Sequence, residues 1–482
     1  MRVEQTGQAP FAFVDLFAGI GGFHAALSAL GGQCWFTSEI DPACRRVYEA
    51  NWGTETAGDI VPLTPDDGPV GIPPHDVLAA GFPCQPFSKS GYQHGFRDAT
   101  RGTLFFNICR VLEEHRPPVI LLENVRNLGG PRQRDTWATI VDTLRDLGYR
   151  VSSTPAVFSP HLLPPERGGT PQVRERVFIT GTYVGRARAL AETAVEPVVR
   201  PVPVDGWDPQ SWDLLSHLPL DAEVVDAARY RLTSAELRML HAWNELLAVL
   251  EEDRLPTFPV WADAFRYPAV VPPGTPLWKA NFLRKNAELY DRNRAAVDAW
   301  LDRHDHLRWL PESRRKLEWQ AQDGERDLLK HVLHLRPSGI RVKRATYLPA
   351  LVAITQTSVY GPWSRRITPR EAARLQGLPD WFDFGGQPDA LTYRQLGNGV
   401  SVGAAYHVLR EHVRRDATDL PDHITQPVLQ AAPLPVVPQR HDGRPVRMTA
   451  GKVVDLGAGE AAVDGGEQVR LDQHDVLGLV HR

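Results

Sequence analysis

The strongest constraint on the fold is the alternation of apolar, strand-like runs with helical patterns along the first 190 residues. Helical patterns lie between these runs, which span residues 11–17, 34–40, 76–81, 119–123, 150–158 and 176–182. Buried strands that alternate with helices indicate a parallel or mixed sheet covered by helices on both faces. We therefore predict an α/β domain whose functional site lies at the carboxyl ends of the strands.

The character of the sequence changes after about residue 190, where proline-rich turns and long amphipathic patterns replace the alternation. These patterns predict helices around residues 232–252, 279–303 and 312–335. After Tyr406 the chain contains no Phe, Trp or Tyr, so that part offers little apolar surface to a core. We predict a first domain over 1–190 that is completed by 393–415, an inserted smaller domain over 191–392, and a poorly structured tail over 416–482.

Charge is distributed unevenly along the chain, although the formal net charge is only -4. Residues 1–100 carry five Lys and Arg against eleven Asp and Glu, whereas residues 279–345 carry sixteen against ten. A phosphate backbone meets one face of a protein and not its average charge, so the basic segment is a candidate nucleic-acid interface. A solvated helical surface is the alternative interpretation of the same charges.

Composition and segment patterns argue against several other classes of protein. No run of about 18 apolar residues occurs, so we expect no transmembrane helix. The amino terminus lacks the basic start of a signal peptide, and Asp15 interrupts its apolar stretch. The four cysteines form no C-x-x-C pair, which favours a reducing compartment and argues against a zinc knuckle. We therefore expect a cytoplasmic protein that holds no metal.

The first strand-like run leads into a glycine turn, in the sequence FVDLFAGIGG of residues 13–22. Gly19 and Gly21 allow positive φ and a close approach of the backbone to a ligand, and the helix that follows presents its amino terminus. The spacing fits a nicotinamide-dinucleotide fingerprint poorly, because His24 occupies the third small position. A purely structural glycine turn is the alternative.

Three acidic residues near the ends of successive strands indicate the kind of ligand. Asp15 at the end of the first strand would repel a pyrophosphate but would suit an amino group or a sulfonium. Glu39 ends the second strand, where a carboxylate can accept both hydroxyls of a ribose. Asp59 is placed for the amino group of an adenine. These are the demands of S-adenosylmethionine.

A cysteine flanked by prolines follows the third strand-like run, in the sequence GFPCQPFS. Pro83 and Pro86 hold Cys84 on a stiff turn at the edge of the sheet, where a thiol is available for chemistry. A buried structural thiol is the alternative, and Cys34 and Cys44 are better examples of it.

A glutamate and two arginines complete the set of candidate catalytic residues. Glu123 follows a strongly apolar strand, and burial there would raise its pKa enough for it to donate a hydrogen bond near neutral pH. Arg174 and Arg176 alternate along an extended segment and are expected to face one site, where they suit a phosphate or a base carbonyl. The alternatives are a helix cap for Glu123 and a surface ion-pair ladder with Glu175 for the arginines.

Taken in order, the motifs DLFAGIGG, GFPCQPFS, ENV, QVRER, RRITPREAARLQGLPD and QLGNGVSV resemble the blocks of the DNA cytosine-5 methyltransferase family, of the bacterial restriction–modification type. The resemblance covers roughly residues 1–182 and 363–410. It implies a Rossmann-like, S-adenosylmethionine-dependent sheet domain, and the intervening residues fall where the family carries its target-recognition domain.

The resemblance also implies roles for single residues. Cys84 matches the nucleophile, Glu123 the residue that engages cytosine N3 and the amino group, and Arg176 the contact to the base carbonyl, with Arg174 in support. Positions that match the cofactor pocket are Phe17, Gly19, Gly21, Glu39, Ile40, Asp59, Ile60, Pro83, Leu104, Asn398 and Val400. Expected DNA contacts are Gln85, Ser88, Arg97, Arg341 and Lys343, and further phosphate contacts are expected among Arg365, Arg366, Thr368 and Arg370.

The implied activity is transfer of a methyl group from S-adenosylmethionine to C5 of a flipped-out cytosine in a specific duplex DNA sequence, through a covalent bond between Cys84 and C6. The product of the cofactor is S-adenosylhomocysteine, and no metal is implied. We expect a monomer that works in the bacterial nucleoid, with a cognate restriction endonuclease as a further partner. By this interpretation the enzyme is a DNA (cytosine-5-)-methyltransferase.

Three other functions compete with this interpretation. A tRNA cytosine-5 methyltransferase shares the catalytic blocks, but the Cys-Phe-Thr triplet that usually marks it is absent from this sequence. A DNA-binding module without catalytic activity would not need to keep the candidate catalytic residues. This sequence keeps all of them, which argues against such a module. A nicotinamide-dependent dehydrogenase is disfavoured by His24 and by the pairing of the PCQ and ENV motifs.

Overall fold

The computed structural model describes residues 11–83, 103–214, 227–250, 255–322, 324–351, 357–434, 448–449 and 452–453. The chain divides into two compact units, residues 1–442 and 443–482. In the second unit the described residues form the short antiparallel hairpin of β16 (Met448–Thr449) and β17 (Lys452–Val453). All other described elements belong to the first unit.

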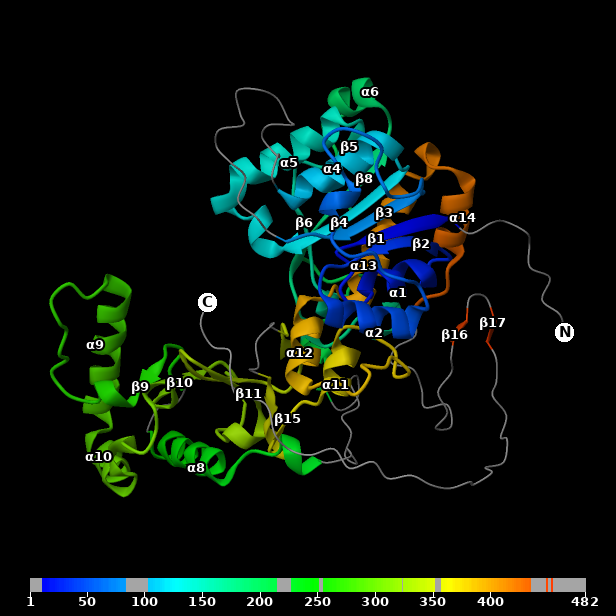
Figure 1. Cartoon of the computed structure of the whole chain (residues 1–482). Helices are drawn as coiled ribbons and strands as arrows, with labels where there is room; N and C mark the ends of the chain where they lie inside the picture. Colours follow the sequence, from blue (N-terminus) through cyan, green and yellow to red (C-terminus); the bar gives the residue numbers. More distant parts are fainter. Residues whose placement is uncertain are drawn as a thin grey trace, which may run out of the picture. The chain divides into compact units, whose positions relative to one another are not determined.

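A seven-stranded sheet forms the centre of one part of the first unit (Figure 1). Its order is β2-β1-β3-β4-β8-β5, and β6 pairs with β8. The first four strands in this order run parallel, whereas β8 runs antiparallel to β4. The strands are β1 (Ala12–Leu16), β2 (Gln33–Ser38), β3 (Val77–Gly81), β4 (Val119–Val125), β5 (Tyr149–Val151), β6 (Ala156–Phe158) and β8 (Arg176–Tyr183). The predicted α/β class is confirmed.

One predicted strand is two strands in the structure. The run over 150–158 is interrupted between β5 and β6, because Ser152 closes a tight turn with the backbone of Thr154 and Pro155 follows without an amide hydrogen to donate.

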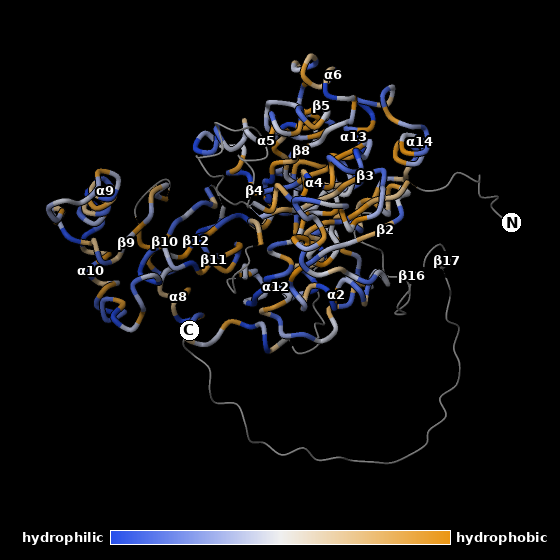
Figure 2. Tube along the Cα trace, turned by 45° about the horizontal axis from the view of Figure 1, so that its top comes forward, coloured by the Kyte–Doolittle hydropathy of each residue, from blue (hydrophilic) through white to orange (hydrophobic). Residues whose placement is uncertain are grey.

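Helices cover both faces of this sheet, as the alternation of side chains on β1 requires. Phe13 packs into one core with α1, α13 and α14, whereas Val14 and Leu16 pack into the other with α4 and α5. Figure 2 shows the apolar residues gathered around β8 and α4. The helices are α1 (Gly22–Ala29), α2 (Pro42–Trp52), α4 (Leu104–His115), α5 (Arg134–Asp146), α6 (Arg186–Ala191), α13 (Val402–Arg415) and α14 (Asp422–Gln430).

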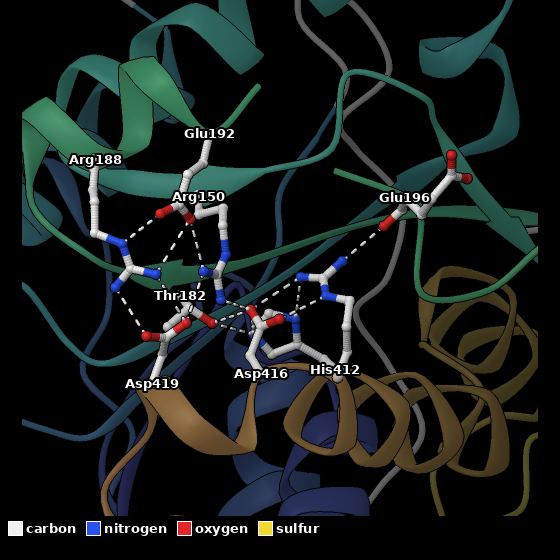
Figure 3. Close-up of polar contacts among 9 residues, drawn as sticks. Arg150, Thr182, Arg188, Glu192, Glu196, His412, Asp416 and Asp419 are labelled. Carbon is white, nitrogen blue, oxygen red and sulfur yellow. Dashed lines mark hydrogen bonds and ion pairs between the residues drawn. The ribbon is translucent and has the colours of Figure 1, made fainter. Parts of the chain in front are cut away.

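A polar network connects helix α13 to the sheet (Figure 3). The hydroxyl of Thr182 on β8 donates to Asp416 Oδ2 at 2.5 Å and lies 3.0 Å from His412 Nε2. Arg150 on β5 pairs with Asp416 at 3.1 Å and with Asp419 at 2.7 Å. Segments more than 200 residues apart are therefore joined at one point.

The prediction of a poorly structured tail from residue 416 is wrong for its first part. Helix α14 lies within that range, and Leu420, Ile424 and Val428 are buried in the same core as α1 and α13. Aliphatic side chains at helical spacing are sufficient for this contact, so the absence of aromatic residues was a poor guide here.

A six-stranded sheet and three helices form a second core in the insert. The strand order is β15-β14-β11-β12-β10-β9. The strands are β9 (Val260–Trp261), β10 (Lys316–Trp319), β11 (Val332–Arg336), β12 (Gly339–Lys343), β14 (Val359–Tyr360) and β15 (Arg365–Arg366). The helices are α8 (Ser234–Val249), α9 (Leu277–Arg292) and α10 (Arg294–Arg303).

Two helical predictions in the insert need correction. The pattern over 312–335 forms β10 and β11 instead of a helix, because its buried residues alternate with period two, as in Leu317 and Trp319. The pattern over 279–303 forms two helices, since Asn293 has non-helical φ and ψ of -114° and 20°. Helix α8 matches the prediction over 232–252 within the described residues.

The insert is connected to the first core by more than its two ends. Strand β13 (Leu348–Pro349) pairs with β7 (Gln172–Val173). Helices α11 (Pro369–Leu375) and α12 (Asp389–Asn398) also contribute Leu375 and Leu396 to the core that contains α1. Residues of the predicted 191–392 domain are therefore shared between the two cores. Within the described part of the chain, no helix is both long enough and apolar enough to cross a bilayer.

Candidate active site

The glycine turn after β1 is packed too tightly for larger residues. Gly21 has a φ of 92°, and a Cβ atom there would lie 2.0 Å from Trp52 Nε1. That indole nitrogen donates to the carbonyl of Ile20 at 3.1 Å, so helix α2 holds the turn in place. A Cβ atom on Gly22 would lie 2.7 Å from the side chain of Val400. The returning carboxyl-terminal segment therefore closes the other side of the turn.

Glu39, at the end of β2, organises the backbone of the same turn. Its Oε2 accepts from the amide of Gly19 at 2.8 Å, and its Oε1 accepts from the amide of Asp41 at 2.8 Å. A carboxylate has about four lone-pair sites, so both oxygens retain acceptor capacity for a ligand. Asp59 accepts from the amide of Val61 at 3.0 Å, beside the buried Ile60. Ile40 is 68% exposed next to Glu39.

Asp15 is the least satisfied polar group at this end of the sheet. It is fully buried, and no hydrogen bond of normal geometry meets either of its oxygens, although the His24 backbone amide lies close enough to favour the charged form. Burial raises the pKa of Asp15 well above its usual range, and the charge of Glu39 adds to the rise. The Glu39 carboxylate and the close backbone approach at this turn suit a cationic ligand such as a sulfonium and disfavour a pyrophosphate.

The segment that leads to the candidate nucleophile is held between β3 and β4. Gly81 on β3 pairs in register with Glu123 on β4, and the Asn124 amide donates to the carbonyl of Phe82 at 2.8 Å. Pro83 is the last described residue of this segment. Cys84, Gln85, Ser88 and Arg97 lie outside the described residues, so their predicted roles stay predictions. Leu104 begins α4, whose first turn is capped by Thr103.

Glu123, near the end of β4, forms an ion pair with Arg176, at the start of the antiparallel neighbour β8. Arg176 Nε lies 2.9 Å from Glu123 Oε1, and both side chains are largely shielded from solvent. Burial raises the pKa of Glu123, while the charges of Arg176 and Arg174 oppose the rise. The direction expected from the sequence is therefore confirmed. A carboxyl group with a raised pKa can carry the proton that a base nitrogen needs.

Arg174 does not share this site in the way that the sequence suggested. Its side chain is 1% exposed, and it donates to the carbonyls of Leu351 at 3.2 Å, Gly397 at 2.8 Å and Gly399 at 2.6 Å. Burial lowers its pKa to about 9. Its charge still reaches Glu123, but its hydrogen bonds hold the glycine turn around Asn398. Arg174 therefore stabilises the glycine turn around Asn398. Of the two arginines, Arg176 is the one that contacts Glu123.

Side chains of the RRITPRE segment stabilise the fold, and the predicted phosphate contacts are not supported. Arg365 and Glu371 form a buried ion pair at 2.6 Å, and Thr368 caps the helix that contains Glu371. Arg366 pairs with Glu236 of α8 at 2.6 Å. Arg370 donates to the carbonyl of Phe382 at 2.6 Å. The spacing of residues could not reveal these partners, because most of them lie on other elements.

Arg341 and Lys343 lie two residues apart on β12 and are both partly exposed on the same face of the second sheet. Their neighbours Glu318 and Arg336 were not singled out individually from the sequence, although the period-two pattern of β10 and β11 would have placed them on that face. In the described residues, no group of three or more His, Cys, Asp or Glu is arranged to hold a metal ion.

Comparisons with known proteins agree with this arrangement. Residues 11–217 and 286–414 match the family model of the C-5 cytosine-specific DNA methylases. The chain is 46% identical over 493 aligned residues to the Type II methyltransferase M.AluI of Cellulosimicrobium cellulans, with 85% of this chain and 93% of that protein covered. It is 31% identical over 396 residues to the Type II methyltransferase M.HpaII of Haemophilus parainfluenzae, with 82% and 87% covered. The crystal structure of the S. pombe Dnmt2 methyltransferase aligns with a TM-score of 0.44 at 17% identity, over 84% of this chain and 99% of that one.

Proposed function

The chain belongs to the C-5 cytosine-specific DNA methylase family and is a DNA cytosine-5-methyltransferase, and from this membership we propose that it methylates a flipped-out cytosine within a specific duplex sequence. The observation that carries the proposal is the ion pair of Glu123 and Arg176 beside the exit of β3. A base inside a stacked duplex could not reach this pair, since both side chains are largely buried.

The family uses S-adenosylmethionine, which supplies an electrophilic methyl group when it is bound. We propose that the turn of Gly19 and Gly21 approaches the methionine part, that Glu39 accepts the ribose hydroxyls, and that Asp59 accepts from the adenine amino group. The acidic turn after β1 supports this assignment. The remaining residues proposed for the pocket are Phe17, Ile40, Ile60, Pro83, Leu104, Asn398 and Val400.

The proposed chemistry at the base begins with the Cys84 thiolate, which forms a bond to C6 of the cytosine. Glu123 donates its proton to N3, and Arg176 donates to the base carbonyl, so the electron pair displaced from the ring accumulates at C5. C5 then takes the methyl group, leaving S-adenosylhomocysteine. Loss of the C5 proton to solvent, release of the thiolate and return of the N3 proton to Glu123 restore the ring.

The relatives are Type II methyltransferases, and we propose that this chain likewise serves as the protective methylase of a restriction–modification system. A cognate endonuclease that cuts the same sequence is then its expected partner. We propose that it acts as a monomer on chromosomal DNA without a metal. The proposed DNA contacts are Gln85, Ser88, Arg97, Arg341 and Lys343.

Bisulfite sequencing of plasmid DNA from a methylation-free host tests the proposal, with the chain and its Cys84→Ser variant expressed side by side. We expect protected cytosines at one short motif, absent from the variant, while DNA and cofactor binding persist. Full methylation by Cys84→Ser would refute the nucleophile. If the wild-type chain protects no cytosine, the duplex-DNA proposal fails, and transfer of labelled methyl groups to tRNA becomes the next assay.

A further inference from the structure

The second sheet has one covered and one polar face. Leu317, Leu333 and Ile340 point into the core that contains α8 and α10. Because side chains alternate along strands, their neighbours lie on the opposite face. That opposite face is partly exposed and carries Lys316, Glu318, His334, Arg336, Arg341 and Lys343. It is strongly basic, with Glu318 as its one acidic member in this set.

Glu318 holds two arginines from neighbouring strands. Its Oε2 accepts from Arg336 Nη2 at 2.5 Å and from Arg341 Nε at 3.0 Å, and its Oε1 accepts from Gln320. Glu318 and Arg341 are register partners in the parallel pair β10–β12. Partial burial opposes ionisation of Glu318, but hydrogen bonds from Arg341 and Arg336 outweigh burial and lower its pKa. The carboxylate is therefore ionised, and both guanidinium groups are held in fixed orientations.

These two arginines keep hydrogen-bond donors in reserve. Within the described part of the chain, Arg341 uses only its Nε, so both of its terminal nitrogens remain available to a ligand. Arg336 differs, because its Nη2 is bonded to Glu318 and its Nε is buried, which leaves only its Nη1 for a ligand. By contrast, both terminal nitrogens of Arg365 donate to Glu371, and one of them also donates to a backbone carbonyl. An arginine fixed through Nε presents its two terminal nitrogens as a fork that fits two adjacent acceptors.

The polar face is linked to the active-site region, because Leu348, five residues after Lys343, pairs with Gln172, four residues before Arg176. The charge of Lys343 reaches His161, whose pKa falls to about 4 through burial and this charge, against the opposing effect of Glu175. Glu175 is the chain neighbour of Arg176, which contacts Glu123. Arg341 lies two residues farther along β12 on the same face. A duplex that delivers a base to Glu123 would therefore continue over Lys343 and Arg341.

The far side of the Glu318 cluster is also open. A groove of about 570 Å³ is lined by Glu318 and Arg336 on one side and by Trp261, Trp278 and Phe282 on the other. Trp278 is 60% exposed at its rim. Glu318 and Arg336 therefore border an open groove on this side of the cluster.

We propose that Arg341 reads a guanine base in the major groove of the target duplex, that Arg336 adds a single donor beside it, and that Glu318 is the positioning residue that aims both arginines. The inference rests on the proposed function and extends it to sequence recognition. A carboxylate 3.0 Å from Arg341 would repel a phosphate, whereas the neutral edge of guanine offers two acceptors without a charge. Lys343 has no carboxylate partner among the described residues, so we assign it to a phosphate.

The test uses a duplex library with randomised positions around a cytosine, read both as methylated sequences and as sequences bound by the protein. For the wild-type chain we expect a motif that contains guanine. Arg341→Ala should lower the preference for one guanine by roughly 5- to 150-fold, and Arg336→Ala should have a smaller effect, because only one of its nitrogens is left for a base. Lys343→Ala should weaken binding to all sequences alike and reduce its salt dependence.

Two further variants separate positioning from folding. Arg341→Lys keeps the charge but not the fork, so it should bind DNA with near wild-type affinity and lose the guanine preference. Glu318→Ala should relax the same positions and add little in the Arg341→Ala, Arg336→Ala background, because it acts through those arginines. Arg308→Ala, at a residue that is 70% exposed on the helical side, is the control and should leave the motif unchanged.

A uniform loss over all sequences in Arg341→Ala and Arg341→Lys, with an unchanged motif, would overturn the inference and leave the proposed function intact. A wild-type chain that binds a motif but methylates nothing would refute the proposed function alone. If the wild-type chain neither binds duplex DNA nor methylates it, both fail.

Discussion

Arg176 Nε, at the start of β8, lies 2.9 Å from Glu123 Oε1, near the end of β4. The antiparallel pairing of β4 with β8 sets Val125 opposite Arg176, so a long arginine side chain reaches back across the ladder to the carboxyl group. Burial favours the protonated form of Glu123 and the arginine favours the ionised form. The two effects therefore act on the protonation of Glu123 in opposite directions, and the rise in its pKa prevails.

Glu123→Gln should lower the rate of methyl transfer roughly 10²- to 10⁴-fold, because an amide cannot deliver the proton to N3. The amide is of similar size, so DNA binding should persist. In the wild-type chain, activity that needs protonated Glu123 should decline as pH rises through its elevated pKa. Single-turnover transfer of labelled methyl groups, measured against pH, checks both points. Wild-type rates in Glu123→Gln would remove this residue from the mechanism.

The position of Glu123 could be predicted from sequence, whereas the partners of Arg174 could not. An apolar run followed by a carboxylate locates Glu123 at a strand exit without knowledge of the rest of the fold. Arg174 and Arg176 alternate along the chain as expected, yet Arg174 finds carbonyls at Gly397 and Gly399, more than 220 residues away. Periodicity fixes which face a side chain takes and says nothing about the element that covers that face.

The same limit explains the errors in the insert and the tail. The 312–335 segment contains apolar residues that satisfy both helical and strand periods over short windows, and only pairing with β9, β11 and β12 decides between them. Helix α14 was missed because its few aliphatic side chains suffice once α1 and α13 provide a surface.

Arg174→Met should destabilise the chain by roughly 3 kcal/mol, because three buried carbonyls lose a charged donor. It should also weaken cofactor binding, since the released turn contains Asn398 and precedes Val400. Urea unfolding and calorimetric titration with S-adenosylmethionine measure the two effects. Arg126→Ala is the matched control, because the Arg126 side chain is 61% exposed in its ion pair with Glu175. Equal effects of the two substitutions would contradict the assigned role.

Gly21→Ala should cost much more stability than Gly53→Ala. Both glycines have positive φ, so both substitutions carry about 1 kcal/mol of backbone strain. Only at Gly21 does the added Cβ meet an obstacle, the Trp52 indole at 2.0 Å, whereas nothing lies within 4 Å at Gly53. Thermal unfolding without cofactor compares them directly. If the two variants melt together, the turn is looser than its packing against Trp52 indicates.

His412 should make the chain less stable in acid. Burial lowers its pKa to about 3, against an ordinary value of 6.5, and the charge of Asp416 opposes the shift. The Thr182 hydroxyl gives its proton to Asp416, so His412 Nε2 must donate to Thr182, and the ring is neutral in the folded chain. Below pH 6.5 this histidine is protonated in the unfolded chain. In the folded chain it stays neutral until the pH falls to about 3. The contribution of His412 to the free energy of unfolding is therefore at its full value above pH 6.5. It declines as the pH falls toward 3, by about 1.4 kcal/mol per pH unit.

His412→Gln should remove this part of the acid dependence, because the glutamine amide can still donate to Thr182 but does not titrate. Urea unfolding between pH 4 and 7 should give a slope about one proton shallower in the variant than in the wild-type chain. His306→Gln, at a half-exposed histidine outside the network, should keep the wild-type slope. Parallel stability curves for His412→Gln and the wild type would mean that His412 is protonated in the folded chain, and the donor assignment to Thr182 would then be wrong.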